Sequence, residues 1–151
     1  MFFEPKNVII LLPMFTNTSL KSPMKITIGC SMRYRDLVKD TISTLKQNGF
    51  TPLFPNLDFG TENKDYATTT QEKKRLAEDH YMAIDNADVV YFITPNGYMG
   101  TSCKIELGYA IAKNKPIYFS EPTNDISLDC YVQGFVPVNN LAKFNQLYTN
   151  S

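Results

Sequence analysis

The segment from Asp88 to Thr94 constrains the fold of this chain more than any other. It reads Asp-Val-Val-Tyr-Phe-Ile-Thr, and its middle is a continuous apolar run. A strand that is apolar on both sides has to be covered on both sides, which is typical of a parallel sheet with helices on each face. The segment therefore predicts the central strand of such a sheet.

Strand patterns and helix patterns alternate along the rest of the chain. Helical spacing of apolar residues predicts helices at 33–48, 72–86, 101–114 and 139–148. Short apolar or β-branched runs predict the other strands at 24–28, 50–54, 116–119 and 135–138. Thr69 and Glu72 have the spacing of a capping box at the start of the second helix. Because such alternation implies right-handed βαβ units, we expect an α/β fold: a doubly wound three-layer sandwich, Rossmann- or flavodoxin-like, with a mostly parallel sheet of about five strands.

The length of the chain, 151 residues, is that of one ordinary domain, and 43% apolar with 20% charged residues is a globular composition. A clean strand pattern begins at Met24. We therefore expect residues 24–151 to form a single domain and residues 1–23 to be a peripheral N-terminal extension. Residues 56–71 are polar and form a longer connection than most, so they are either a lid or a mobile loop.

The composition argues against several classes of protein. Fifteen Lys and Arg balance fifteen Asp and Glu, so the chain lacks the strong positive charge of domains that bind nucleic acid polymers. The three cysteines form no CxxC pair and His80 is the single histidine, which argues against a disulfide framework and a metal site. The longest apolar run, Val8 to Phe15, is shorter than the roughly 20 residues that span a bilayer. We expect a cytoplasmic protein that has no membrane partner and needs no metal or other cofactor.

Two short turns follow predicted strands at the edge where α/β proteins bind their ligands. They are Gly29–Arg33 and Asn96–Ser102, and the 56–71 loop reaches the same edge. Turns that lead into helices present backbone N–H groups to an anion, and Arg33 and Arg35 add positive charge. Turns and helix starts also favour Gly, Ser and Thr in any case. Neither turn matches the GxGxxG or GxxxxGKS/T patterns, which argues against a dinucleotide cofactor and against ATP.

Glu106 is the candidate nucleophile. On a helix that begins near Thr101, its side chain leans back toward the helix N-terminus. Its neighbours are apolar or small, and a carboxylate among them is costly unless a site uses it. The helix dipole is expected to keep Glu106 ionised. The same pattern also fits a glutamate on the solvated face, or one paired with Lys104 or Lys113.

A second acidic group lies upstream, in Glu78-Asp79-His80 on the preceding predicted helix. Two groups that flank a sugar can divide their roles, one attacking the anomeric carbon and the other protonating the leaving group. Asp79 and His80 are the candidates for the second role, and the unperturbed pKa of His80 lies near neutrality. A solvated surface run is the alternative. Cys103, near a predicted helix start, has a lowered pKa if exposed and is otherwise a core residue.

Four segments together resemble the nucleoside 2-deoxyribosyltransferase family, which includes the 2′-deoxynucleoside 5′-phosphate N-hydrolases. They are Ala87–Val90, Gly97–Ser102, Glu106–Ala110 and Lys115–Ile117, within a likeness that extends over residues 24–119. The resemblance implies a doubly wound sheet and a glutamate nucleophile, here Glu106, that forms a covalent deoxyribosyl-enzyme. A second base resolves this intermediate in a transferase, and water resolves it in a hydrolase.

The resemblance also implies a small-molecule nucleoside or nucleotide substrate and residues that hold it. Ser31 and Arg33 resemble a turn that handles a 5′-phosphate. Asp79 or His80 then assists departure of the base, and Tyr98 stacks on the base or closes the pocket. Backbone N–H groups are expected to hold the sugar or phosphate at Gly100, Thr101 and Ser102. With nine Tyr and ten Phe residues available for an interface, we expect a homo-oligomer.

Three positions depart from the family pattern. Thr27 stands where the family has a tyrosine that orients the nucleophile, His80 where it has an aspartate, and Gly100 where it has Asp or Ser. These changes keep open a non-catalytic nucleotide-binding or sensor module on the same scaffold. The run Pro95–Thr101 is also distantly similar to the motif of cytokinin-activating phosphoribohydrolases, so an N-glycosidase of that type is a further alternative.

Overall fold

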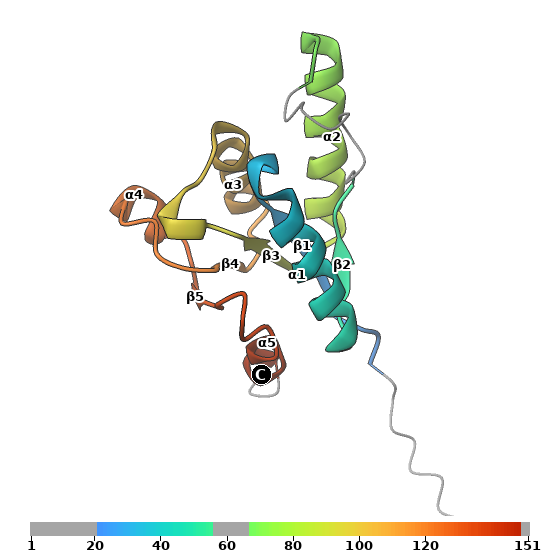
Figure 1. The fold of residues 1–151 in the computed structure, drawn as a ribbon, viewed down its shortest axis with the longest axis vertical. Coiled ribbons are helices and arrows are strands. Elements are labelled where there is room, and N and C mark those ends of the chain that lie inside the picture. The colour runs from blue at the N-terminus through green and yellow to red at the C-terminus, as the bar shows by residue number, and fades with distance from the viewer. Residues whose placement is uncertain (1–20, 56–66, 149–151) are drawn as a thin grey trace, which may run out of the picture.

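The structure of the protein is a computed structural model that describes residues 21–55 and 67–148. Five parallel strands form one sheet in the spatial order β2-β1-β3-β4-β5 (Figure 1). The strands are β1 (Lys25–Gly29), β2 (Thr51–Leu53), β3 (Val89–Phe92), β4 (Ile117–Phe119) and β5 (Gly134–Phe135). This is the flavodoxin-like order of a doubly wound fold, so the predicted fold class is confirmed.

Alternate strand residues build two apolar cores, one on each face of the sheet. All four residues of β3 are buried, with Tyr91 in one core and Phe92 in the other. The helices cover the two faces in pairs, α1 (Arg35–Gln47) with α5 (Lys143–Tyr148), and α2 (Thr70–Asn86) with α3 (Thr101–Ala112). The continuous apolar run in the sequence therefore reflects a strand that is covered on both sides.

Helix α2 begins where its capping box predicts. The hydroxyl of Thr69 accepts a hydrogen bond from the backbone N–H of Glu72 (3.1 Å), and the Glu72 carboxylate accepts one from the N–H of Thr68 (2.8 Å). These bonds satisfy donors that have no partner inside the helix. They define the start of the helix that forms one wall of the site.

The C-terminal part differs from the sequence prediction in three places. Strand β5 ends at Phe135, earlier than predicted: the N–H of Val136 still donates to the carbonyl of Phe119 (2.9 Å), and Pro137 then opens a turn closed by the N–H of Asn140 (2.9 Å). The chain then turns, and α5 begins only at Lys143. A short helix that was not predicted, α4 (Ile126–Asp129), follows Asp125, whose side chain caps its first turn.

Part of two predicted segments lies outside the described residues. These parts are residues 1–20 of the expected extension and residues 56–66 of the expected 56–71 loop. Within the ranges that the structure does describe, no helix combines the length and the apolar character needed to cross a membrane.

The chain leaves β1 and β3 toward opposite faces of the sheet, because α1 and α3 cover different faces. In doubly wound folds such a switch opens a crevice at the carboxyl ends of the two strands. The strand ends are close together: a Cβ on Gly29 would overlap the ring of Phe92. The two turns that the sequence analysis assigned to a ligand therefore flank this crevice.

Candidate active site

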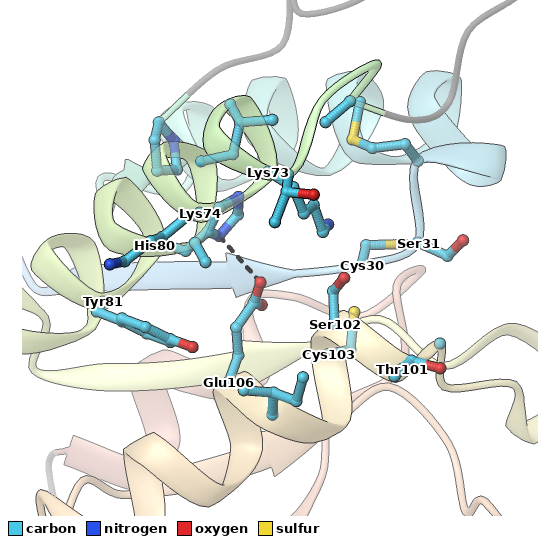
Figure 2. Close-up of a pocket in the computed structure, with 18 of the residues that line it drawn as sticks. Cys30, Ser31, Lys73, Lys74, His80, Tyr81, Thr101, Ser102, Cys103 and Glu106 are labelled. Atoms are coloured by element: carbon cyan, nitrogen blue, oxygen red, sulfur yellow. Dashed lines mark ion pairs between the residues drawn. The ribbon is translucent and has the colours of Figure 1, made fainter.

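A cavity of about 600 Å³ opens at the carboxyl ends of β1 and β3 (Figure 2). A cavity of this size suits a small organic ligand. The turn after β1, the first part of α2 and the first turns of α3 line it. The described lining residues with a polar nitrogen or oxygen in the side chain are Ser31, Thr70, Lys73, Lys74, His80, Tyr81, Tyr98, Thr101, Ser102 and Glu106.

Glu106 projects from α3 toward α2 in this cavity, and 7% of the residue is exposed (Figure 2). No described residue donates a hydrogen bond to its carboxylate. Burial raises the pKa of Glu106 to about 7, although the Lys73 ammonium acts in the opposite direction. Burial therefore opposes the ionised state that the helix dipole favours, and close to pH 7 the carboxyl is only partly ionised.

His80 faces Glu106 from α2. Its Nδ1 lies 3.7 Å from Oε1 of Glu106, which is too far for a hydrogen bond. That Nδ1 is buried without a hydrogen-bond partner among the described residues, and the ring packs edge-on against Phe54. Burial above all, and then the charge of Lys73, lowers the pKa of His80 to about 4, with Asp79 acting in the opposite direction. His80 is therefore neutral at pH 7, with a ring nitrogen free to bond to a ligand.

Lys73 is a site residue that the sequence analysis missed. It lines the cavity from α2, and its positive charge lowers the pKa of three groups there, Glu106, His80 and Cys103. A signal was present in the sequence, because residues seven apart lie on the same face of a helix and Lys73 is seven residues before His80. Lys74 also lines the cavity.

The turns after β1 and β3 meet at the end of the cavity where α3 begins. Gly100 is the N-cap of α3 and has no side chain that could bond to the first N–H groups of the helix. A Cβ on Gly100 would lie 3.9 Å from the Cβ of Ser31 and 3.6 Å from the hydroxyl of Tyr98. Thr101 and Ser102 follow in the first turn of α3, and all five residues line the cavity. The structure thus brings these predicted site residues together.

Arg33 and Asp79 are predicted site residues that lie outside the cavity lining. The guanidinium of Arg33 lies 4.4 Å from the centre of the Tyr98 ring, a cation–π contact that holds it against this side chain. Asp79 is half-buried on α2, and its charge raises the pKa of His80. Asp79 therefore influences the cavity through His80 and does not face it.

Thr27, at the position of the family tyrosine, is bonded elsewhere: its buried hydroxyl donates to the carbonyl of Ala83 on α2 (2.7 Å). Cys30 and Cys103 line the cavity but are buried, and burial raises the pKa of Cys30 to about 12 and that of Cys103 well above its usual value. Cys103 is thus the core residue of the two alternatives. Within residues 21–55 and 67–148, no three His, Cys, Asp or Glu side chains are placed to hold a metal ion.

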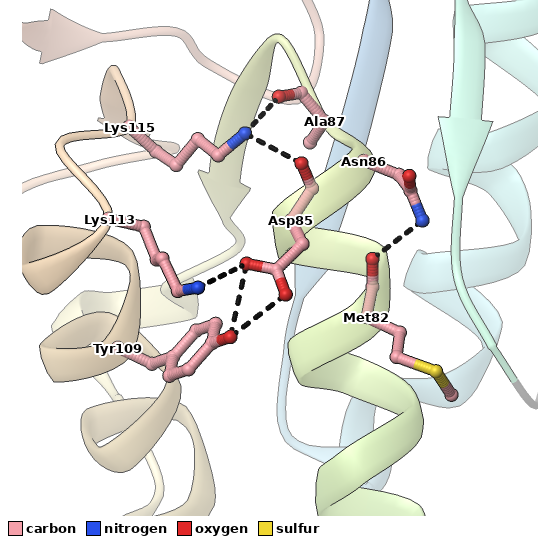
Figure 3. A network of polar contacts seen from close by, with 7 residues as sticks. All are labelled: Met82, Asp85, Asn86, Ala87, Tyr109, Lys113 and Lys115. Carbon is pink, nitrogen blue, oxygen red and sulfur yellow. Dashed lines mark hydrogen bonds and ion pairs between the residues drawn. The ribbon is translucent and has the colours of Figure 1, made fainter.

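A polar network ties α2 to α3 beyond His80 (Figure 3). The hydroxyl of Tyr109 donates to the carboxylate of Asp85 (2.9 Å), and Lys113 forms an ion pair with the same carboxylate (3.2 Å). Lys115 donates to two backbone carbonyls at the end of α2 (2.9 and 2.8 Å). Tyr109 and Lys115, both from the family-like segments, therefore hold the helix of His80 against the helix of the candidate nucleophile.

Comparison with known proteins identifies solved structures with a similar fold. The 2-deoxyribosyltransferase of the psychrotolerant bacterium Bacillus psychrosaccharolyticus has a similar structure, with a TM-score of 0.58 and 19% sequence identity over 82% of this chain and 95% of that chain. The CMP N-glycosidase of Clostridium botulinum has a TM-score of 0.51 and 16% identity, over 82% of this chain and 99% of that chain. At these identities, the two structures support the fold alone.

A search among curated proteins finds no match. The family description "Nucleoside 2-deoxyribosyltransferase", however, matches the sequence over residues 29–142, which include both turns, α2 and α3. With a match over most of its length and a cavity at the switch point of the matching fold, the chain belongs to the nucleoside 2-deoxyribosyltransferase family.

Proposed function

We propose that the protein is an enzyme that cleaves the N-glycosidic bond of a 2′-deoxynucleoside or its 5′-monophosphate, through a covalent intermediate on Glu106. Membership of the family supports action on a nucleoside. The observation that carries the residue assignment is the Glu106 side chain, which is 10% exposed and faces the cavity without a hydrogen-bond partner among the described residues. A buried carboxyl without a partner is costly unless a ligand uses it.

The first step begins with one proton on the pair, bound to the Glu106 carboxyl, whose Oε1 lies 3.7 Å from Nδ1 of the neutral His80. As the substrate aligns, this proton passes from the carboxyl to Nδ1 of His80, which leaves a carboxylate beside an imidazolium. A carboxylate oxygen attacks C1′, the C1′–N bond breaks, and its electron pair leaves with the base, which takes the proton from His80. The products are a free base and a glutamyl-deoxyribose ester.

In the second step, water or a ring nitrogen of another base attacks C1′ of the ester and releases Glu106. His80, now neutral, takes the proton that the attacking group loses, so the pair returns to its one-proton state. Two displacements at C1′ retain the configuration of the sugar. Hydrolysis and transfer differ only in whether water or a second base occupies the cavity.

The substrate is proposed to be held at the end of the cavity where α3 begins. The uncapped N–H groups of α3 and the hydroxyl groups of Ser31, Thr101 and Ser102 would bond to the sugar or phosphate. Tyr98 stacks on the base or closes the cavity. Arg33 positions the Tyr98 ring through its cation–π contact with it. The homo-oligomeric state and the cytoplasmic location stay predictions.

A non-catalytic nucleotide sensor is the second candidate, and Thr27 is the observation that favours it. The Thr27 hydroxyl bonds to Ala83, so the position of the family tyrosine offers no group that orients Glu106. The Glu106 carboxyl, with its pKa of about 7, is also partly protonated at neutral pH. A sensor would hold an intact nucleotide and release no base.

The test is to incubate the purified protein with 2′-deoxynucleosides, their 5′-monophosphates and the corresponding ribonucleotides, with and without a second free base. Liquid chromatography follows base release and base exchange. Either reaction, if lost in Glu106→Ala, supports the proposal: exchange identifies a transferase and release alone a hydrolase. Cleavage of ribonucleotides only would identify the phosphoribohydrolase-like alternative. Binding of an intact nucleotide without release of base would support the sensor.

A further inference from the structure

The cavity carries net positive charge. Lys73 and Lys74 line it from α2, and Glu106 is the one carboxylate among the described lining residues. His80 is neutral at pH 7, since its pKa is lowered to about 4. Two ammonium groups thus face one partly ionised carboxyl, and such a cavity favours an anionic ligand.

The register of α2 against α3 places Lys73 near the start of α3. The two helices run side by side in the same direction, because the residue pairs in contact advance together along both. Lys73 lies about 10 Å along the helix before His80, and Thr101 lies about 7.5 Å before Glu106. Lys73 and the uncapped first turn of α3 therefore stand at a similar level, more than one helical turn from the nucleophile.

Arg33, the cation in the turn that resembles a phosphate site, is held elsewhere. Its guanidinium lies over the exposed Tyr98 ring, and Arg33 is not part of the cavity lining. Lys73, by contrast, has no ion-pair partner among the described residues and lines the cavity. Lys73 is therefore better placed than Arg33 to meet an anion inside the cavity.

We propose that Lys73 is a specificity-determining residue that binds a 5′-phosphate, so that the enzyme prefers a nucleoside 5′-monophosphate to the free nucleoside. The proposal rests on the proposed function, because it takes C1′ of the substrate to lie at Glu106. With the 5′ end directed toward the start of α3, the phosphate meets the Lys73 ammonium, the Ser31 hydroxyl and the first N–H groups of α3. All are donors, and a phosphate monoester with a second pKa of about 6 is largely a dianion at pH 7.

The test compares Lys73→Gln with Arg33→Gln and with Lys104→Gln, a control that removes an exposed lysine on α3 outside the cavity lining. For each protein, kcat/KM is measured for a 2′-deoxynucleoside 5′-monophosphate and for the same nucleoside without phosphate. The ratio of the two values is the readout. Any effect of Lys73 on the protonation of Glu106 acts on both substrates and cancels in this ratio.

We expect Lys73→Gln to lower this ratio at least about tenfold, the loss expected for one charge-assisted hydrogen bond. Arg33→Gln should change the ratio less, and Lys104→Gln should leave it as in the wild type. An equal loss on both substrates in Lys73→Gln would overturn the proposal, because Lys73 would then act on the nucleophile alone. A larger fall in Arg33→Gln would overturn it as well.

Calorimetry separates failure of this proposal from failure of the proposed function. If the wild type cleaves no substrate, the four common 2′-deoxynucleoside 5′-monophosphates are titrated into the wild type and into Lys73→Gln. Binding that is at least about tenfold weaker in the variant supports Lys73 as the phosphate ligand without any catalysis. Equal binding to both proteins, or no binding of any monophosphate, rejects that assignment.

Discussion

The Nδ1 atom of His80 lies 3.7 Å from the Oε1 atom of Glu106, and burial shifts the pKa values of these two groups in opposite directions. The pKa of His80 falls to about 4 and that of Glu106 rises to about 7. Both shifts favour the uncharged form, so between these values the pair holds one proton and carries no ion pair. Because the groups are coupled, the values belong to the pair as a unit.

This pairing predicts an unusual dependence of activity on pH. The one-proton pair is the form that supplies both a carboxylate and a proton donor, and the pair loses that proton as the pH rises through about 7. We therefore expect kcat/KM to be highest below pH 7 and to fall about tenfold per pH unit well above it. Initial rates from pH 5 to 9 measure this alkaline limb. An increase in kcat/KM from pH 7 to 9 would show that Glu106 acts without a proton from the pair.

Replacing Glu106 by glutamine should separate catalysis from folding. Glu106→Gln keeps the size of the side chain but removes the oxygen nucleophile, so turnover is expected to fall by several orders of magnitude. At pH 6 the wild-type carboxyl is itself mostly protonated, so the melting temperature there should be close to that of the wild type. Base release by chromatography and thermal unfolding at pH 6 test the two parts. A variant that keeps wild-type rates would rule out Glu106 as the nucleophile.

The same shifts act on stability with opposite signs. The folded protein holds the Glu106 proton more tightly (about 7 against an ordinary 4.5), so this contribution to the free energy of unfolding falls as the pH rises from 4.5 to 7. It holds the His80 proton less tightly (about 4 against an ordinary 6.5), so this contribution rises between pH 4 and 6.5. Each amounts to about 3 kcal/mol over its full interval, and the two nearly cancel.

Removing either group should reveal the effect of the other. In Glu106→Gln, His80 still titrates, and in His80→Gln, Glu106 still does. As the pH increases from 4.5 to 6.5, the free energy of unfolding of Glu106→Gln should therefore rise relative to that of His80→Gln. Urea unfolding of both variants at closely spaced pH values measures this difference, and titrations elsewhere in the chain cancel in the comparison. Parallel pH profiles for the two variants would contradict the assigned shifts.

Local sequence patterns were enough to predict the layers of the fold. The continuous apolar run of β3 requires cover on both faces, and the capping box at Thr69 and Glu72 sets the start of α2. The spacing of Glu106 from the start of α3 fitted both a position at the ligand edge and one on the solvated face, and the family resemblance favoured the first. These features depend on neighbours in the sequence or on general rules of topology.

Long-range packing decided what the sequence could not predict. The protonation of Glu106 and His80 depends on how α2 packs against α3, because burial is the main cause of both shifts. Lys73 was missed because a lysine in the polar first part of a helix usually faces solvent alone, whereas the exposed Lys73 also lines the cavity. Arg33 was expected in the site, but its contact with Tyr98 depends on the meeting of two turns that are distant in sequence.

Thr27 offers a test of how far this chain departs from its family. Its hydroxyl donates to the carbonyl of Ala83, so Thr27→Val should remove one buried hydrogen bond and lower the free energy of unfolding by about 1 kcal/mol. Thr27 does not line the cavity, so kcat/KM should change little. Urea unfolding and initial rates test the two parts. A large loss of kcat/KM at unchanged stability would instead show that Thr27 takes over the orienting role of the tyrosine.

The close approach of β1 and β3 beside the cavity makes Gly29 sensitive to a single methyl group. A Cβ on Gly29 would overlap the ring of Phe92, which is buried and has little room to move, so Gly29→Ala should lower the free energy of unfolding by about 1–3 kcal/mol. Gly108 in α3 is a matched control: a Cβ there has no heavy atom within 4 Å. Gly108→Ala should raise the free energy of unfolding by about 0.5–1 kcal/mol, because alanine favours a helix interior over glycine. Urea unfolding measures the free energy of unfolding of both variants. If Gly29→Ala were as stable as the wild type, the Phe92 ring would have moved aside without cost.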